Sequence, residues 1–122
     1  MHNFRELQIW KDSRKLVKEI YLVTRNFPDQ EKYILASQIQ RSAISVPSNI
    51  AEGSGRKNKE FMHFLSIALS SAFECETQLY LASDIGYLEE NKLNDLTTEI
   101  QIIQKKIYKF RLTLEPRQVL NP

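Results

Sequence analysis

The stretch from Gln38 to Gly53 reads QIQRSAISVPSNIAEG, and its pattern decides the fold. Its apolar residues, together with one just before it, recur three and four positions apart: Ala36, Ile39, Ala43, Val46 and Ile50. This spacing places the side chains on one face of an α-helix. Asp29 is a candidate N-cap before the pattern, and Gly53 and Gly55 follow its end. The stretch therefore predicts a buried helix that ends at the glycines.

Pro47 lies inside this helical pattern. Proline has no backbone N–H to donate, and its ring crowds the carbonyl of the residue four positions earlier, here Ala43. Because the apolar spacing carries on through Ile50, we expect the proline to kink the helix rather than end it.

A second helix is predicted on the N-terminal side, over about residues 4–26. Asn3 and Glu6 have the spacing of a capping box, and Pro28 stops the pattern. The apolar stripe consists of Leu16, Ile20, Val23 and Phe27. A further stripe lies beside it and consists of Trp10, Val17, Tyr21 and Thr24. Two stripes give more apolar surface than one buried face requires, which indicates a partner.

Two more helices are predicted on the C-terminal side. Asn58 is a candidate cap for the first, which ends at Gly86, and the second runs from about Glu90 to Leu114 before Pro116. The stripe of the first is Phe61, Leu65, Ala68, Ala72, Cys75, Leu79 and Ala82. The stripe of the second is Leu93, Leu96, Ile100, Ile103, Ile107, Phe110 and Leu114.

The chain length and the short connections specify how these helices combine. A chain of 122 residues with 42% hydrophobic residues is long enough for one core and too short for two. Short connections make neighbouring helices antiparallel. We predict an all-α, antiparallel up-down four-helix bundle over residues 1–115, followed by a loose C-terminal tail over residues 116–122.

The composition favours a cytoplasmic protein. Cys75 is the single cysteine, so no internal disulfide can form. The first residues lack the layout of a signal peptide, and no apolar run reaches membrane-spanning length. We therefore expect a location in the cytoplasm and no membrane partner.

The residue types that carry chemistry are scattered. His2 and His63 are far apart, and neither has a second ligand at metal-binding spacing. Cys75 lies on an apolar stripe, where a buried and inert thiol is expected. No serine has a nucleophile-elbow context, and no glycine loop is built to hold a phosphate. We expect no metal, no cofactor and no catalytic residue.

A polar stripe runs beside the predicted core. Its members on the helix that ends at Gly53 are Gln38, Arg41, Ser45, Asn49 and Glu52. Its members on the helix that follows Asn58 are Ser71, Glu74 and Gln78. Folding the hairpin back at the glycines brings Arg41 opposite Glu74, so we predict an ion pair that sets helix register. We expect Glu52 to cap the next helix or to pair with Arg56 or Lys59. A structural role is favoured over catalysis for these residues.

The net charge of +2 is small, but the charges are unevenly distributed. Residues 1–60 hold eleven Lys and Arg against seven acids, whereas residues 60–91 hold six acids and no Lys or Arg. The candidate phosphate contacts are Lys11, Arg14, Lys15, Arg56, Lys57 and Lys59. In a monomer such patches are usually solvated faces, but in a symmetric ring they would repeat as one basic surface.

Several motifs resemble one known family. They are Trp10-Lys11, Phe27-Pro28, Gln38-Ile39-x-Arg41-Ser42-Ala43-x-Ser45-x-Pro47-x-Asn49-Ile50-Ala51-Glu52-Gly53, Phe64-Leu65-x-Ile67-Ala68, Glu74, Gln78-Leu79 and Gly86-Tyr87-Leu88. The chain resembles, over residues 4 to about 112, the four-helix bundle proteins encoded within 23S ribosomal RNA intervening sequences. The resemblance implies a homopentameric, barrel-like ring without enzymatic activity. A related branch, the accessory variability proteins of diversity-generating retroelements, is thought to bind nucleic acid and a reverse transcriptase.

Three classes of function follow. The leading hypothesis is a non-enzymatic oligomeric scaffold that binds RNA or DNA through the six basic residues above. The alternative is a protein adaptor whose ring docks a partner, such as a reverse transcriptase or another enzyme, through apolar and acidic surface. An enzyme that uses Glu52, Glu74 or His63 is the least favoured class.

Overall fold

The computed structural model describes residues 1–31 and 33–116, and the part of the predicted tail from residue 117 onward lies outside the described residues. The described residues form four α-helices: α1 (Gln8–Thr24), α2 (Leu35–Ser54), α3 (Asn58–Asp84) and α4 (Glu90–Thr113). Two short 3₁₀ helices precede α1 and α2, at Phe4–Glu6 and Asp29–Glu31. Over this part of the chain no strand is present, so the predicted all-α class with four helices is confirmed.

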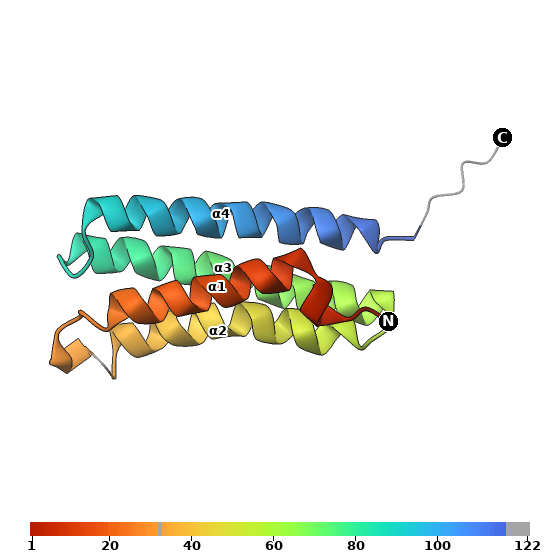
Figure 1. Ribbon diagram of the computed structural model, residues 1–122, viewed down its shortest axis with the longest axis horizontal. Helices are drawn as coiled ribbons and strands as arrows, with labels where there is room; N and C mark the ends of the chain where they lie inside the picture. The colour runs from red at the N-terminus through yellow and green to blue at the C-terminus, as the bar shows by residue number, and fades with distance from the viewer. Residues whose placement is uncertain (32, 117–122) are drawn as a thin grey trace.

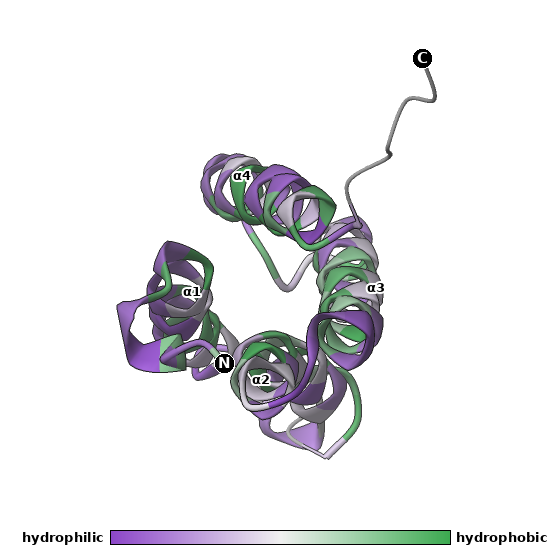
Figure 2. Cartoon of the chain, turned by 90° about the vertical axis from the view of Figure 1, so that its right-hand side faces the viewer, coloured by the Kyte–Doolittle hydropathy of each residue, from purple (hydrophilic) through white to green (hydrophobic). Residues whose placement is uncertain are grey.

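Each helix returns alongside the one before it, and the four surround one core (Figures 1 and 2). Hydrogen bonds between neighbours show the direction of the return. Ser42 contacts Gln78 and Ser45 contacts Ser71, so residue numbers rise along α2 as they fall along α3. Helix α4 closes the bundle against α1, and the connections between helices stay at its two ends (Figure 1).

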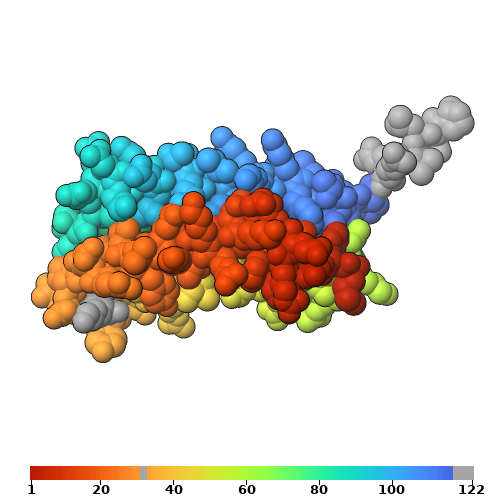
Figure 3. Space-filling model, in the orientation of Figure 1, coloured from red at the N-terminus to blue at the C-terminus, as the bar shows by residue number. Residues whose placement is uncertain are grey.

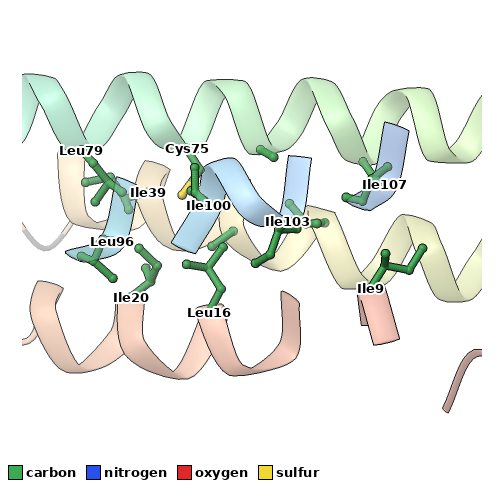
Figure 4. Packing of buried hydrophobic residues seen from close by; sticks show 14 of the residues in the cluster. Ile9, Leu16, Ile20, Ile39, Cys75, Leu79, Leu96, Ile100, Ile103 and Ile107 are labelled. Carbon is green, nitrogen blue, oxygen red and sulfur yellow. The ribbon is translucent and has the colours of Figure 1, made fainter. Parts of the chain in front are cut away.

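The core is formed by the predicted apolar stripes (Figure 4). Leu16 and Ile20 of α1 face Ile39 of α2, Leu79 of α3 and Ile100 of α4, and all five are fully buried. Burying an aliphatic side chain of this size contributes about 1.5–3 kcal/mol, so this layer is a main source of stability. Phe110 is only partly buried, and the sequence patterns missed two core residues, Ile9 and Leu88.

The predicted first helix is interrupted near its start. Asn3 accepts a hydrogen bond from the backbone N–H of Arg5 at 3.2 Å, but this cap serves a 3₁₀ turn rather than the main helix. Leu7 is extended, with φ −74° and ψ 126°, and α1 begins after it. The turn is held because Leu7 packs on the core and the Phe4 ring lies 5.1 Å from the Trp10 ring. A single helix over residues 4–26 is therefore wrong.

The predicted starts of α2 and α3 are also corrected. Asp29 begins a short 3₁₀ helix, and α2 starts only at Leu35, because Tyr33 and Ile34 are exposed and bring no burial to support an earlier start. Asn58 is the first residue of α3, and Lys57 stands at its N-cap without a side-chain hydrogen bond. Helix α2 continues through Pro47, as expected from the apolar spacing.

The second stripe of α1 is used within the chain. Trp10 and Val17 pack against the core, and the buried Thr24 hydroxyl accepts a hydrogen bond from Gln40 of α2 at 2.9 Å. Only Tyr21 of this stripe is exposed, at 41%. Three of the four residues of this stripe are therefore used within the chain, and Thr24 joins α1 to α2.

Gly53 allows α2 and α3 to approach each other next to their connection. A Cβ at this position would lie 2.6 Å from Cβ of Phe64 and 2.8 Å from Cδ1 of Phe61. Both distances are shorter than carbon atoms tolerate, and the nearer atom is anchored to the α3 backbone. The glycine is therefore required by packing between the helices.

We expect Gly53→Ala to lower the free energy of unfolding by about 1–3 kcal/mol, because α3 must shift to admit the methyl group. Helix propensity alone would predict the opposite, a gain in stability, since alanine is more favourable than glycine in a helix by about 1 kcal/mol. Thermal denaturation followed by circular dichroism measures the effect. Gly55→Ala is the matched control, because nothing lies within 4 Å of its added Cβ. Equal melting temperatures for the two variants would contradict the packing role.

Candidate nucleic-acid interface and acidic groove

The predicted polar stripe joins α2 to α3 through hydroxyl and amide groups. The Ser42 hydroxyl donates to Oε1 of Gln78 at 2.7 Å, and the Ser45 and Ser71 hydroxyls are 2.8 Å apart. Ser42 was not among the predicted members, although it directly precedes the buried Ala43 in the stripe. Short polar side chains fit here because the two helices lie close together.

The predicted Arg41–Glu74 ion pair is wrong. Both residues are exposed, and Glu74 instead accepts a hydrogen bond from Nε2 of Gln78 at 3.2 Å. The helix rotation that turns Ser42 and Ser45 toward α3 turns Arg41 toward solvent. The register of α2 and α3 is therefore set by neutral hydrogen bonds rather than by a charge pair.

The remaining members of the stripe stay within α2 or face solvent. Asn49 donates to the backbone oxygen of Ser45 at 2.8 Å and to its hydroxyl at 2.9 Å. Gln38 and Glu52 are exposed. Glu52 does not cap α3, whose N-cap is Lys57, and it makes no ion pair with Arg56 or Lys59. Arg56 pairs instead with Glu60 one helical turn away, at 3.1 Å.

We expect Ser42→Ala to lower the free energy of unfolding by about 1–3 kcal/mol, because the buried Gln78 amide loses its donor. Urea denaturation measures the loss. Arg41→Ala, one residue earlier and exposed, should change stability by less than about 0.5 kcal/mol. A larger loss for Arg41→Ala than for Ser42→Ala would restore the ion pair as the determinant of register.

The candidate reactive groups occupy structural positions. Burial raises the pKa of the Cys75 thiol to about 12, so the thiolate is strongly disfavoured. The His2 ring packs against Phe61 and Phe110, at centroid distances of 5.3 and 5.7 Å. Within residues 1–31 and 33–116, no group of three or more His, Cys, Asp or Glu side chains is arranged to hold a metal ion.

Three of the six predicted phosphate contacts, Lys11, Arg14 and Lys15, lie on α1 and are exposed. The Arg14 guanidinium lies 5.3 Å from the centroid of the Trp10 ring, which restricts its motion. Lys15 approaches Glu19 at 3.8 Å but remains 72% exposed, so this surface pair contributes little. Lys11 makes no ion pair with any described residue.

The other three, Arg56, Lys57 and Lys59, lie at the turn between α2 and α3 and are also exposed. Arg56 is held between the Phe64 ring, 5.5 Å from its guanidinium carbon, and Glu60. The start of α3 has no side-chain cap, so its first backbone N–H groups are directed at solvent beside Lys57 and Lys59. Such helix starts attract anions.

The fold places both basic groups in the same half of the bundle, the half that carries the chain's N-terminus (Figure 1). Residues 1–15, 46–70 and 103–116 make up this half and hold eleven Lys and Arg against five acids. Four of these cations come from the end of α4, at Lys105, Lys106, Lys109 and Arg111. Arg111 is used structurally, because its Nε donates to the Met62 backbone oxygen at 3.1 Å and to the Ser66 hydroxyl at 2.9 Å.

The opposite half is acidic. Residues 16–30, 33–45 and 71–102 hold nine acids against four Lys and Arg. In this half a hollow of about 800 Å³ opens between the end of α1 and the start of α4. Figure 3 shows the face on which these two helices meet. The sequence patterns did not identify the hollow, because no motif marks a boundary between the first and the last helix.

Two carboxyl groups face each other in this region, one from each helix. Burial and a hydrogen bond with Glu19 raise the pKa of Glu99 to about 7. The Asp12 charge adds to this rise, and Lys15 opposes it. The two carboxyl groups therefore share a proton below neutral pH, since a hydrogen bond between them requires one.

A salt bridge joins α1 to α4 beyond this pair of carboxyl groups, toward the basic half of the bundle. Lys106 of α4 donates to Oδ2 of Asp12 on α1 at 2.9 Å. Burial opposes ionisation of Asp12, but hydrogen bonds from Lys106 and Gln8 outweigh it and lower the pKa of the carboxyl. The contact between α1 and α4 therefore depends on polar groups at its edge.

Removing the Glu99 carboxyl should change how stability depends on pH. Its pKa is raised from 4.5 to about 7, so its contribution to stability is full below about pH 4.5 and is lost as the pH rises through about 7. We expect Glu99→Gln to be more stable than the wild type at about pH 8 and to lose this advantage near about pH 5. Thermal melts across this range measure it.

Glu90→Gln serves as the control, because it removes the same charge from the exposed first turn of α4. It should not reproduce the pH-dependent gain. A constant difference between Glu99→Gln and the wild type across the range would contradict proton sharing with Glu19.

The fold and site define a class: an all-helical, four-helix protein with separated basic and acidic surfaces. Residues 5–109 match the family described as 23S rRNA-intervening sequence protein, so the chain belongs to that family, as the motifs indicated. No curated protein matches the chain. No helix among the described residues is long and apolar enough to cross a membrane.

One solved structure supports the fold. It is a protein with unknown function from the S23 ribosomal protein family of Bacteroides thetaiotaomicron VPI-5482. The two chains superpose with a TM-score of 0.79 and are 23% identical, over 84% of this chain and 97% of that chain. At this identity the likeness shows that the fold is shared.

Proposed function

We propose that the protein acts in the cytoplasm as a non-enzymatic scaffold that binds RNA or DNA. In this proposal, antiparallel up-down bundles assemble into a homopentameric ring, and phosphates contact the basic half of each bundle. The residues assigned to this contact are Lys11, Arg14, Lys15, Arg56, Lys57 and Lys59.

The separation of charge along the bundle carries the proposal. The chain has almost no net charge, yet one half of the bundle has an excess of six positive charges. Lys57 and Lys59 stand beside the uncapped start of α3, which adds backbone donors for an anion. Exposed cations at this density favour binding to the phosphate backbone of nucleic acid. Such contacts do not depend on the base sequence.

Self-assembly is supported by apolar surface on α3 and α4. Phe73 and Tyr80 lie seven residues apart on α3, and Tyr108 and Leu112 lie four apart on α4, so each pair shares a helix face. Their exposed fractions are 52%, 43%, 54% and 43%. Contiguous apolar patches, to which residues on a shared helix face can contribute, are typical of surfaces that pack against another chain. A contact between unlike surfaces closes into a ring when its rotation permits.

We expect the protein to bind labelled single-stranded RNA or duplex DNA with an affinity that falls steeply between about 50 and about 200 mM salt. Light scattering on the same sample should give five times the chain mass of 14.3 kDa. The variant Lys11→Gln/Lys57→Gln/Lys59→Gln should bind more weakly and lower the salt slope by about one per contact removed. Fluorescence anisotropy measures both quantities.

A matched control removes three exposed cations from the acidic half, in the variant Arg25→Gln/Arg41→Gln/Lys92→Gln. This variant should bind nucleic acid as the wild type does or slightly better. Equal losses in the two variants would mean that total charge, and not the basic half, determines binding. A wild-type assembly that binds neither RNA nor DNA would refute the proposed function.

A further inference from the structure

The hollow between α1 and α4 is part of a longer groove. The hollow of about 800 Å³ adjoins a second of about 350 Å³, and Asp95 and Glu99 line both. The lining extends along α4 from Leu88, just before the helix, to Lys106. At 1.5 Å per residue this is about 27 Å, so the groove suits an elongated occupant rather than a compact one.

The groove combines an apolar floor with an acidic edge. Leu22 and Ile102 are each 47% exposed in the lining, and the buried residues Val23, Leu88 and Leu96 complete its floor. The carboxylates of the main hollow are Glu19, Glu89, Asp95 and Glu99, and Lys92 is the one base in its lining. An occupant must therefore bring positive charge and apolar surface together.

These features exclude several kinds of ligand. A phosphate backbone would be repelled by the carboxylates. The described part of the chain holds no group of side chains suited to a metal ion. A small inorganic cation would leave the apolar floor in contact with water. A peptide segment with basic and apolar residues meets all three requirements of length, charge and apolar surface.

We propose that the groove between α1 and α4 binds a basic amphipathic segment of a partner protein, with its apolar residues on the leucine floor and its Lys or Arg side chains at Glu19 and Glu99. The carboxylates Glu19, Glu89 and Asp95 lie outside the basic half, and the groove reaches that half only at one end, where its lining includes Asp12, Lys15 and Lys106. The inference does not rest on nucleic-acid binding.

Binding of such a segment is linked to the proton shared by the two carboxyl groups. A guanidinium or ammonium group pairs best when both carboxylates are ionised, so it displaces that proton. The other charged groups that face the pair are Asp12 and Lys15 of α1 and Asp95 and Lys106 of α4. Affinity should therefore rise between about pH 6 and about pH 8.

The test uses an 18-residue peptide of leucine and lysine in helical amphipathic order, capped at both ends, and the same peptide with glutamate in place of lysine. Methyl NMR should show chemical-shift changes at Leu22, Val23, Leu88 and Leu96 when the lysine peptide is added, and none when the glutamate peptide is added. Core methyls of the other half, at Ile50 and Leu65, should stay unchanged. Calorimetry gives the affinity at each pH.

Glu19→Gln/Glu99→Gln should weaken binding of the lysine peptide about tenfold and remove its pH dependence. Lys92→Gln should strengthen binding. The control Glu52→Gln/Glu90→Gln removes two exposed carboxylates outside the groove and should bind as the wild type does. Circular dichroism establishes that each variant is folded.

Several results would overturn the inference. They are binding that maps to another face, equal binding of the glutamate peptide, and an unchanged affinity in the Glu19→Gln/Glu99→Gln variant. A change in the light-scattering mass of that variant would also overturn it, by making the groove a contact between copies. The RNA titration separates the two proposals, because Glu19→Gln/Glu99→Gln should keep nucleic-acid binding and Lys11→Gln/Lys57→Gln/Lys59→Gln should keep peptide binding.

Discussion

The close approach of α2 and α3 is the constraint on which the rest of the structure depends. At Gly53 a single added carbon would lie 2.6 Å from Phe64. Close to this approach, short side chains of α2 fit against α3: Ser42 makes a buried hydrogen bond to Gln78, and Ser45 makes a partly buried one with Ser71. These neutral bonds fix the rotation of α2, because a buried polar group without a partner is costly. That rotation turns the apolar stripe of α2 toward α1 and α4.

The bundle is closed differently on its other side. Helices α1 and α4 meet through charged groups at the edge of the core, with the Asp12–Lys106 salt bridge at one place and the Glu19–Glu99 pair at another. Long charged side chains hold helices further apart than small hydroxyl groups do. The groove follows from this difference, and in it the pKa of Glu99 is raised to about 7 because burial and the neighbouring Glu19 disfavour its charge.

The up-and-back path of the chain converts an uneven sequence into two charged surfaces. Basic residues near the chain start, at the α2–α3 turn and at the end of α4 come together in one half of the bundle (Figure 1). Acidic residues from α3 and the start of α4 collect in the other half. A protein with almost no net charge can thus present one surface to phosphates and another to cations, which is the physical basis of both proposals.

The four helices, the core and the family were determined by the sequence itself, because a period of 3.6 residues and glycine or proline stops are local properties. Leu16, Ile39, Leu79 and Ile100 are buried as their spacing predicts. The 3₁₀ break at Leu7, the choice of Ser42 over Arg41 as the contact with α3, and the groove were decided only by the tertiary structure. Each depends on the rotation and separation of packed helices, which helical spacing along the chain does not specify.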